Sequence, residues 1–257
     1  ERPVGNITNN TLSLEKENIP QPKDGECLFQ LNYLSLDPTN RIWMSDETQY
    51  MPPVVLGEPM RGVVCGTVLE SMTPDFKKGD IVSGIGTWSD YQIGSPESVG
   101  LLSQIDNVSA MDAFATLALV GPSAYFCLLD IGEPKAGETV VVSTAAGAVG
   151  SIAGQIAKIK GCRVVGLTGS DEKCRWIKEE LGFDAAINYK TANLPDALSK
   201  SCPNGIDIYF DNVGGTILDE CLKLMNLYGR IPTCGLISQY NALEPVPGPY
   251  NYSLILM

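Results

Sequence analysis

The sequence contains no histidine, and this absence excludes several kinds of catalytic site. A histidine-ligated zinc ion, a Ser-His-Asp triad and a Cys-His dyad each require an imidazole. Catalysis by this 257-residue chain must therefore come from a bound cofactor or from Tyr, Lys, Asp, Glu, Ser or Cys side chains. No metal site is expected.

Basic residues are also scarce, because 18 lysines and arginines stand against 30 acidic residues and the net charge is −12. Such a charge repels nucleic-acid backbones and anionic membrane surfaces, so neither is an expected partner. The most apolar stretch, residues 113–129, is interrupted by Gly121-Pro122. We interpret it as buried helix and strand, not as a membrane span. The first five residues also lack the basic-then-apolar pattern of a signal peptide.

The eight cysteines form no Cys-x-x-Cys pair, and several stand inside apolar runs. A free cysteine in such a run behaves as a small hydrophobe. We interpret the cysteines as reduced, which predicts a cytoplasmic location. Cys65 and Cys234 have no neighbouring base in the sequence. A buried structural role is therefore favoured over that of a thiolate nucleophile.

The sequence does contain enough apolar residues for a core, since 44 % are hydrophobic and 19 % are charged. The first half consists of short apolar segments separated by Gly and Pro. It predicts strands at residues 27–34, 63–70, 80–84 and 91–93. Residues 1–125 are therefore expected to form a compact, mostly β domain.

From about residue 137 the pattern changes to alternating strands and helices. Strands are predicted at 139–144, 163–167, 185–188, 206–210 and 230–234, and helices at 149–159, 171–181 and 216–227. Such alternation is typical of an α/β domain with a doubly wound parallel sheet. That fold normally has six strands when it binds dinucleotides. Because five are counted and the chain stops in the apolar run 253–257, we expect a truncated domain whose final strand is missing.

Residues 145–150, Ala-Ala-Gly-Ala-Val-Gly, join the first of these strands to its helix. They match the dinucleotide-binding fingerprint with Ala in place of the first Gly. After Ala146, Gly147 would let a pyrophosphate approach the backbone, and Gly150 would let the helix pack closely on the strand. The pyrophosphate would bind the free N–H groups at the positive end of the helix. An ordinary tight turn has a similar composition, but the strand-turn-helix setting favours a dinucleotide site.

NAD-binding versions of this fold place an acid about 20 residues after the motif, where it holds the ribose 2′-hydroxyl. Here that position holds Thr168-Gly169-Ser170, and Lys173, Arg175 and Lys190 follow. Basic residues in place of an acid favour a 2′-phosphate and predict NADP(H) as cofactor. The alternative is that Lys173 is a solvated surface charge.

Several segments of the chain resemble one known family. They are residues 145–160, 169–173 (GSDEK), 188–190 (NYK), 210–215 (FDNVGG) and 237–241 (ISQYN), together with 36–38, 50–53 and 57–62 in the first half. The family is the zinc-free group of medium-chain dehydrogenases/reductases that contains prostaglandin reductases, plant alkenal double-bond reductases and bacterial curcumin reductases. The resemblance extends over essentially the whole chain.

The resemblance implies a GroES-like catalytic and substrate domain at residues 1–125 and an NADP(H)-binding Rossmann domain at residues 126–257, with a cofactor cleft between them. It also implies hydride transfer from NADPH to the β-carbon of an α,β-unsaturated ketone or aldehyde, which is the expected small-molecule partner. Related enzymes are often dimers through the Rossmann domain, so a homodimer is an expectation as well.

The family's cofactor residues are matched by residues of this chain. Ala148 and Val149 would lie on the pyrophosphate loop, and the 2′-phosphate would lie near Gly169, Ser170, Lys173 and Tyr189. The resemblance implies that the nicotinamide half is held by Asn212 and by Cys234, Gly235, Ile237, Ser238 and Tyr240.

Hydride addition to an enone leaves negative charge on the carbonyl oxygen, so a proton donor is needed. Without histidine or metal, tyrosine hydroxyls and the nicotinamide ribose hydroxyl are the candidates. Tyr50, Tyr240 and Tyr252 lie in segments expected near the cleft, and Tyr240 is the first choice. The alternative is that these tyrosines only line the pocket and solvent supplies the proton. Related enzymes often carry a further tyrosine where this chain ends, at Met257.

Other interpretations remain open at this point. The chain would also fit an NADPH-binding relative without catalytic activity, or a quinone oxidoreductase. A truncated domain that exposes an unpaired sheet edge would tend to aggregate instead of folding stably.

Overall fold

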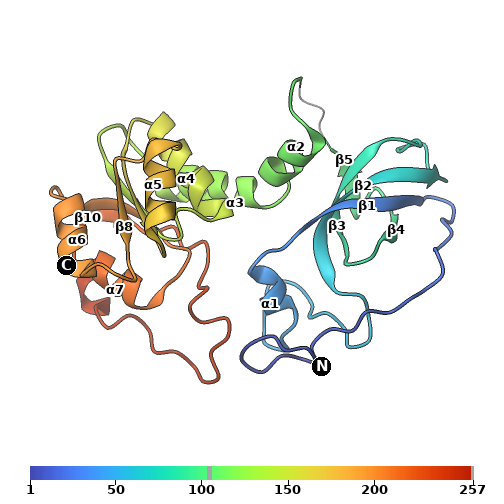
Figure 1. Ribbon diagram of the computed structural model, residues 1–257, viewed down its shortest axis with the longest axis horizontal. Coiled ribbons are helices and arrows are strands. Elements are labelled where there is room, and N and C mark those ends of the chain that lie inside the picture. The colour runs from blue at the N-terminus through green and yellow to red at the C-terminus, as the bar shows by residue number, and fades with distance from the viewer. Residues whose placement is uncertain (103–105, 256–257) are drawn as a thin grey trace. The chain divides into compact units, whose positions relative to one another are not determined.

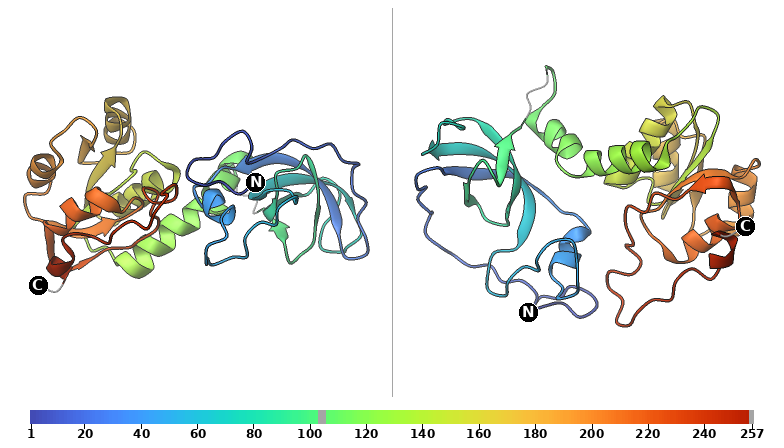
Figure 2. Two further views of the ribbon diagram at one scale, coloured as in Figure 1. Left: turned by 90° about the horizontal axis from the view of Figure 1, so that it is seen from below. Right: turned by 180° about the vertical axis from the view of Figure 1, so that it is seen from behind.

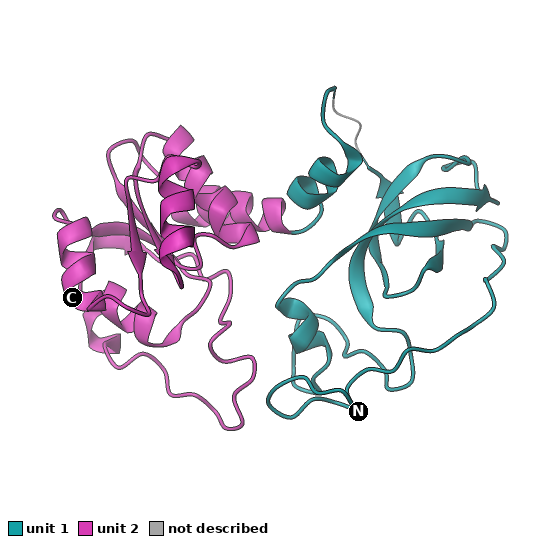
Figure 3. Ribbon diagram, in the orientation of Figure 1, with its two compact units in different colours: residues 1–119 teal, residues 120–257 magenta. Residues whose placement is uncertain are grey.

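A computed structural model describes residues 1–102 and 106–255 of the chain (Figure 1). The chain divides into two compact units, Glu1–Leu119 and Val120–Met257, which Figure 3 shows in different colours. The observed boundary lies at the start of helix α3 (Val120–Phe126), and the predicted boundary, between residues 125 and 126, lies at the end of the same helix.

The first unit is built on an antiparallel sheet of five strands in the order β4-β1-β2-β3-β5. These strands are β1 (Cys27–Ser35), β2 (Arg61–Ser71), β3 (Ile81–Thr87), β4 (Tyr91–Gly94) and β5 (Val99–Leu101). Two short helices, α1 (Thr39–Trp43) and α2 (Ala110–Leu117), complete the unit. The four predicted strands are confirmed, whereas β5 was not predicted because three residues are too few for an alternating pattern.

Two clusters of apolar side chains hold the first unit together. One contains Phe29, Val64, Val68, Val82 and Val99 from the sheet, and the other packs around the buried Trp43 of α1. A turn at residues 76–80 links β2 to β3. Gly79 adopts a φ of 92° there, and the Asp80 carboxylate accepts a hydrogen bond of 2.9 Å from the N–H of Lys77. Glycine suits this position because other residues rarely adopt positive φ.

The second unit contains a parallel sheet of five strands in the order β10-β9-β6-β7-β8. Its elements in chain order are α3, the π-helix η1 (Cys127–Gly132), β6 (Thr139–Val142), α4 (Ala148–Ile159), β7 (Arg163–Thr168), α5 (Asp171–Glu179), β8 (Ala185–Asn188), α6 (Leu194–Ser201), β9 (Ile206–Phe210), α7 (Gly215–Leu222), β10 (Met225–Arg230) and the 3-10 helix η2 (Tyr252–Ile255). The predicted α/β doubly wound fold is therefore confirmed.

Helices cover both faces of the parallel sheet, which Figure 2 shows from two further directions. Along β6, Val140 and Val142 contact the cluster that includes side chains of α3, η1, α4 and α5. Val141 points to the opposite face and contacts side chains of α6 and α7. Successive residues of a strand alternate between faces, so a strand covered on both sides needs a continuous apolar run.

The strand order has one functional consequence. The chain runs from β6 through β7 to β8 on one side of the sheet and then returns to β9 and β10 on the other side. The order therefore reverses between β6 and β9. In open parallel sheets, ligands bind at the carboxyl ends of the strands where this reversal occurs.

Two sequence-based expectations about helices and strands are wrong. Residues 113–129 contain no strand, because α2, α3 and η1 account for this stretch. The fifth strand was expected at 230–234 after a helix at 216–227, but α7 ends at Leu222 and β10 spans Met225–Arg230. β10 is irregular, because Tyr228 adopts a φ of 61° and the register with β9 shifts between Met225 and Arg230. Of the apolar run at 253–257, the last two residues lie outside the described part.

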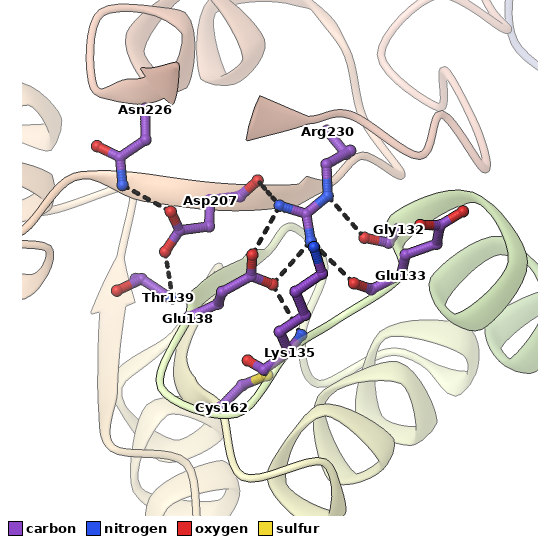
Figure 4. A network of polar contacts seen from close by, with 9 residues as sticks. All are labelled: Gly132, Glu133, Lys135, Glu138, Thr139, Cys162, Asp207, Asn226 and Arg230. Atoms are coloured by element: carbon purple, nitrogen blue, oxygen red, sulfur yellow. Dashed lines mark hydrogen bonds and ion pairs between the residues drawn. The ribbon is translucent and has the colours of Figure 1, made fainter. Parts of the chain in front are cut away.

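Arg230 fixes the end of β10 through a polar network (Figure 4). Its guanidinium group forms two hydrogen bonds of 2.7 and 2.9 Å with the Glu138 carboxylate. It also donates to the carbonyl oxygens of Gly132 and Glu133. These bonds hold the backbone at the end of β10, and therefore the start of the segment that follows it, beside β6 and β9.

The Arg230–Glu138 ion pair makes stability depend on pH. Hydrogen bonding to Arg230 lowers the pKa of Glu138 below its usual 4.5. A carboxyl group whose pKa is lower in the folded state contributes stability above its unfolded pKa and loses it as the pH falls through the folded pKa. We therefore expect Glu138→Gln to lower stability at pH 7, with a difference from the wild type that shrinks below about pH 4.5. Urea unfolding between pH 3 and pH 7 measures this, and a difference independent of pH would contradict it.

Within residues 1–102 and 106–255, no single helix has the length and apolar composition needed to cross a membrane. Helix α2 and the α3–η1 segment are bent relative to each other. Taken together, the two helices are long and apolar enough by length and composition alone. All eight cysteines lie in the described part of the chain, and none is joined to another by a disulfide bond.

Candidate functional site

The turn between β6 and α4 carries the glycine motif. The N–H of Gly147 donates to the carbonyl oxygen of Thr144 (2.8 Å), and Gly147 is the N-cap of α4 without a side-chain hydrogen bond. The first turn of α4 contains Ala148, Val149 and Gly150, and the first N–H groups of a helix have no partner within the helix. They are therefore oriented to bind an anionic group.

Gly150 permits the close approach of α4 to the strand that precedes it. A Cβ atom at this position would lie 2.3 Å from the carbonyl oxygen of Thr144 and 3.0 Å from the Cα of Ala145. Thr144 itself adopts a φ of 51°, which is unusual for a β-branched residue. Strained backbone of this kind is concentrated at functional sites.

A pocket of about 190 Å³ lies beside this turn. Its lining comes from the ends of β6, β7 and β8 and from the start of α5: Thr144, Ala146, Gly147, Thr168, Gly169, Ser170, Lys173, Tyr189 and Lys190. The structure therefore brings together six residues that the sequence analysis named as cofactor-binding, and it adds Lys190 as a second amine. The pocket combines two lysine amines with four hydroxyl-bearing side chains and lies beside the N-terminus of α4, which suits a phosphate group.

Glycine at position 169 leaves room for the side chains that form this pocket. A Cβ there would lie 3.2 Å from the Tyr189 hydroxyl oxygen and 3.5 Å from the Lys190 Nζ. Ser170 caps α5, because its Oγ accepts a hydrogen bond from the N–H of Lys173 (3.3 Å). The cap places Lys173 in the first turn of α5, on the side of the pocket.

A second group of predicted residues lies where β6 and β9 end, at the reversal of the strand order. The Asn212 side chain donates to the carbonyl oxygen of Ser143 (2.7 Å), and the Asn212 N–H donates to the Ser143 hydroxyl (2.8 Å). The N–H of Ile237 donates to the carbonyl oxygen of Asn212 (3.2 Å), and the Ser238 hydroxyl donates to that of Val213. These bonds join the turn after β9 to the loop 234–240.

The three candidate tyrosines have different surroundings. The Tyr240 hydroxyl accepts a hydrogen bond from the N–H of Leu236 (3.1 Å) and lies near Gly235, so it belongs to the loop 234–240. Tyr252 is exposed on η2. Tyr50 belongs to the first unit, where its hydroxyl accepts from the Trp43 indole N–H (3.0 Å) and contacts the Thr39 hydroxyl. The hydroxyl groups of Tyr240 and Tyr50 therefore have hydrogen-bond partners, although the side chain of Tyr50 is as exposed as that of Tyr252.

The two cysteines considered as nucleophiles have unreactive thiols. Burial raises the pKa of Cys65 to about 11. Burial and the neighbouring Cys127 raise the pKa of Cys234 to about 12. A thiol with such a pKa holds almost no thiolate near neutral pH, so the structural role favoured from the sequence agrees with these surroundings.

Sequence reasoning missed some of the residues that build the two groups. Lys190 was noted only as an available cation, and Thr144 and Ser143 were given no role. Their contributions depend on positive φ and on contacts between segments about 70 positions apart, such as Ser143 with Asn212, which no local pattern reveals. Among the described residues, no three His, Cys, Asp or Glu side chains gather as metal ligands would.

An antiparallel unit followed by a doubly wound parallel sheet, with a glycine-containing turn at the start of α4 and a cationic pocket beside it, is typical of two-domain proteins that bind dinucleotides. Family models agree, because residues 1–102 match the N-terminal domain of oxidoreductases and residues 148–252 match a family described as zinc-binding dehydrogenases.

The NADPH-dependent curcumin reductase of Escherichia coli is 45% identical over 99% of this chain and 74% of its own length. Prostaglandin reductase 1 of Bos taurus is 44% identical over 96% of this chain and 74% of its own. The structure of CurA from Vibrio vulnificus in complex with NADPH has a TM-score of 0.91 at 44% identity, with 99% of this chain and 75% of that one covered. The chain belongs to the zinc-free reductases of the medium-chain dehydrogenase/reductase family.

The protein is accordingly an NADP(H)-dependent oxidoreductase, with a GroES-like first domain and a Rossmann second domain. The residues present fit this cofactor. The turn at Gly147 and Gly150 leaves space and N–H groups for a pyrophosphate, and the pocket with Lys173 and Lys190 offers cations for a 2′-phosphate. The strand β7 ends at Thr168 and is followed by Gly169, without the acid that holds an unphosphorylated ribose.

Proposed function

We propose that the protein reduces the carbon–carbon double bond of α,β-unsaturated ketones or aldehydes at the expense of NADPH. The observation that carries this proposal is the 45% identity, over almost the whole chain, to a protein named NADPH-dependent curcumin reductase. The likeness to prostaglandin reductase 1 supports the same class of substrate. The absence of histidine agrees with it, because enone reduction needs no metal ion or imidazole.

We assign the adenosine half of NADPH to the pocket between β7 and β8. Lys173 and Lys190 would bind the 2′-phosphate together with Ser170 and Tyr189, and Gly169 would leave space for it. Ala146, Gly147, Ala148, Val149 and Gly150 would bind the pyrophosphate through the start of α4. Asn212, Cys234, Gly235, Ile237 and Ser238 would hold the nicotinamide half, with Tyr240 beside them.

NADPH supplies the hydride when it is bound. The hydride joins the β-carbon of the enone, and the electron pair of the double bond moves toward the carbonyl oxygen, where negative charge develops. A hydrogen-bond donor at that oxygen lowers the barrier, and a proton must reach the α-carbon. The products are the saturated carbonyl compound and NADP⁺, and one proton is consumed.

We propose Tyr240 as the donor because its hydroxyl oxygen accepts from the N–H of Leu236 and its own proton is left to donate. Tyr240→Phe should therefore lower kcat by about 10²-fold, with little change in the affinity for NADPH. Tyr50→Phe and Tyr252→Phe are the matched variants. If Tyr240→Phe keeps the wild-type kcat while one of the other two loses it, the donor is the other tyrosine. If none of the three lowers kcat, solvent supplies the proton.

Absorbance of NADPH at 340 nm tests the proposed activity directly. We expect loss of absorbance with a simple enone such as 3-nonen-2-one and none with the saturated ketone. Turnover of a quinone but not of the enone would favour a quinone oxidoreductase instead. Tight NADPH binding without turnover of either substrate would favour an NADPH-binding relative without catalytic activity.

We also propose a cytoplasmic location, which the eight free thiols support, and a homodimer. Sedimentation equilibrium of the purified chain measures its oligomeric state. A single species of monomer mass at micromolar concentration would contradict the homodimer.

A further inference from the structure

Asp211 is a buried carboxylate that lies outside the proposed contacts to NADPH. It follows β9 directly, at the reversal of the strand order, and it is fully buried. A buried carboxylate is costly unless its oxygens accept hydrogen bonds. The hydrogen bonds of Asp211 therefore indicate its structural role.

The side chain of Asp211 holds the turn that leads into α7. Its Oδ1 accepts hydrogen bonds from the N–H of Val213 (2.9 Å) and of Gly214 (2.8 Å). The hydroxyl of Tyr209 donates to the same oxygen (2.8 Å). Burial raises the pKa of Tyr209 well above its usual range, so this hydroxyl keeps its proton. Among the described residues, the Oδ2 of Asp211 has no hydrogen-bond partner.

The backbone of Asp211 holds the loop 234–240. Its carbonyl oxygen accepts from the N–H groups of Cys234 (2.8 Å) and Gly235 (3.1 Å), and its own N–H donates to the carbonyl oxygen of Pro232 (2.9 Å). One residue thus binds both segments that carry the proposed nicotinamide-binding residues. Four donors converge on Oδ1, since the Ser143 hydroxyl also lies 3.5 Å from it. The turn at Val213 and Gly214 is therefore fixed relative to the backbone that holds the loop.

We propose that Asp211 is a positioning residue for the nicotinamide half of NADPH, because it holds the turn 212–214 in register with the loop 234–240. It does not touch the pocket that receives the 2′-phosphate, whose lining comes from other elements. This inference rests on the proposed assignment of Asn212 and the loop 234–240 to the nicotinamide half.

The test compares two ligands that share the adenosine half. NADPH occupies both parts of the site, whereas 2′,5′-ADP carries the adenosine and the 2′-phosphate but no nicotinamide. Titrations of the full chain with each ligand give two dissociation constants. For Asp211→Ala we expect the Kd of NADPH to rise about tenfold and the Kd of 2′,5′-ADP to stay within about twofold.

Asp211→Asn is the second variant, because it retains an acceptor oxygen and is the more conservative change. It loses the charge that strengthens the bonds to Val213 and Gly214, so the Kd of NADPH should rise about threefold, again without a change for 2′,5′-ADP. A general loss of folded protein would instead raise the Kd of NADPH and the Kd of 2′,5′-ADP by the same factor. Equal increases of the two constants in both variants would overturn the proposal. An unchanged ratio of the two constants in both variants would overturn it as well.

Asp207 provides a matched control on the same strand. Its carboxylate also accepts a backbone N–H, that of Thr139 (2.8 Å), and a side-chain amide, that of Asn226 (2.7 Å), within the network of Figure 4. It lies at the start of β9, whereas Asp211 follows its end. Asp207→Ala should lower the melting temperature and leave the ratio of the two dissociation constants unchanged.

Asn212→Ala separates a failure of this inference from a failure of the site assignment. If Asn212→Ala weakens NADPH selectively and the Asp211 variants do not, Asp211 is not a positioning residue although the nicotinamide site is correct. If Asn212→Ala leaves both dissociation constants unchanged, the assignment of Asn212 to the nicotinamide half is wrong, and the Asp211 proposal that rests on it is wrong as well.

Discussion

Replacing Lys173 and Lys190 together by alanine is expected to raise the Kd of NADPH by about 10³-fold and to leave the Kd of NADH almost unchanged. Both lysines line the pocket beside the phosphate turn, and Lys190 Nζ lies close to Gly169. A hydrogen bond to a charged group contributes about 1.5–3 kcal/mol, and about 1.4 kcal/mol corresponds to a factor of ten. Two such bonds in the middle of that range account for the expected change.

The fluorescence of bound nicotinamide measures both affinities. Lys178→Ala is the matched control, because Lys178 belongs to the last turn of the same helix α5 and does not line the pocket. It should leave the Kd of NADPH within about twofold of the wild type, in line with the small effect of exposed surface charges. Equal weakening of NADPH and NADH in the double variant would mean that these lysines do not recognise the 2′-phosphate.

Replacing Gly150 by valine is expected to abolish measurable NADPH binding. The added Cβ alone would lie 2.3 Å from the carbonyl oxygen of Thr144, and backbone atoms cannot move aside as a flexible side chain can. Helix α4 must then shift away from the strand, and the N–H groups of its first turn lose their alignment for the pyrophosphate. Overpacking of this kind also costs about 1–3 kcal/mol of stability.

Thermal unfolding with and without NADPH separates the two effects. The wild type should gain stability when NADPH is added, because a ligand that binds only the folded state raises its melting temperature. Gly150→Val should show no such gain. Gly100→Val is the control, since a Cβ at Gly100 would meet nothing within 4 Å. A normal NADPH-dependent gain in Gly150→Val would show that close packing at Gly150 is not needed for the site.

The parts of the fold that follow local patterns could be predicted from the sequence. The boundaries of β8 and β9 agree with the prediction, and α4 begins one residue before its predicted start. These elements are regular, and their apolar residues recur with the period of a strand or a helix. The glycine motif at 145–150 was located because it depends on the order of neighbouring residues.

The errors arise where distant contacts decide the structure. β10 was placed too late because Tyr228 adopts positive φ and because Arg230 is held by Glu138, which precedes β6. The contacts of Asp211 could not be predicted for the same reason, since its bonds to Cys234 and Gly235 join segments more than twenty positions apart. The pocket was predicted in part, because Lys190 reaches Gly169 only when β7 and β8 lie side by side.

The fate of the hydride tests most directly whether the protein reduces the carbon–carbon double bond of an enone. NADPH that carries deuterium at the transferred position of the nicotinamide C4 is incubated with the protein and an enone, and the product is examined by NMR. We expect a saturated ketone with deuterium on the β-carbon. An unsaturated alcohol with deuterium on the carbonyl carbon would contradict it, because the carbonyl group and not the double bond would then be the site of reduction.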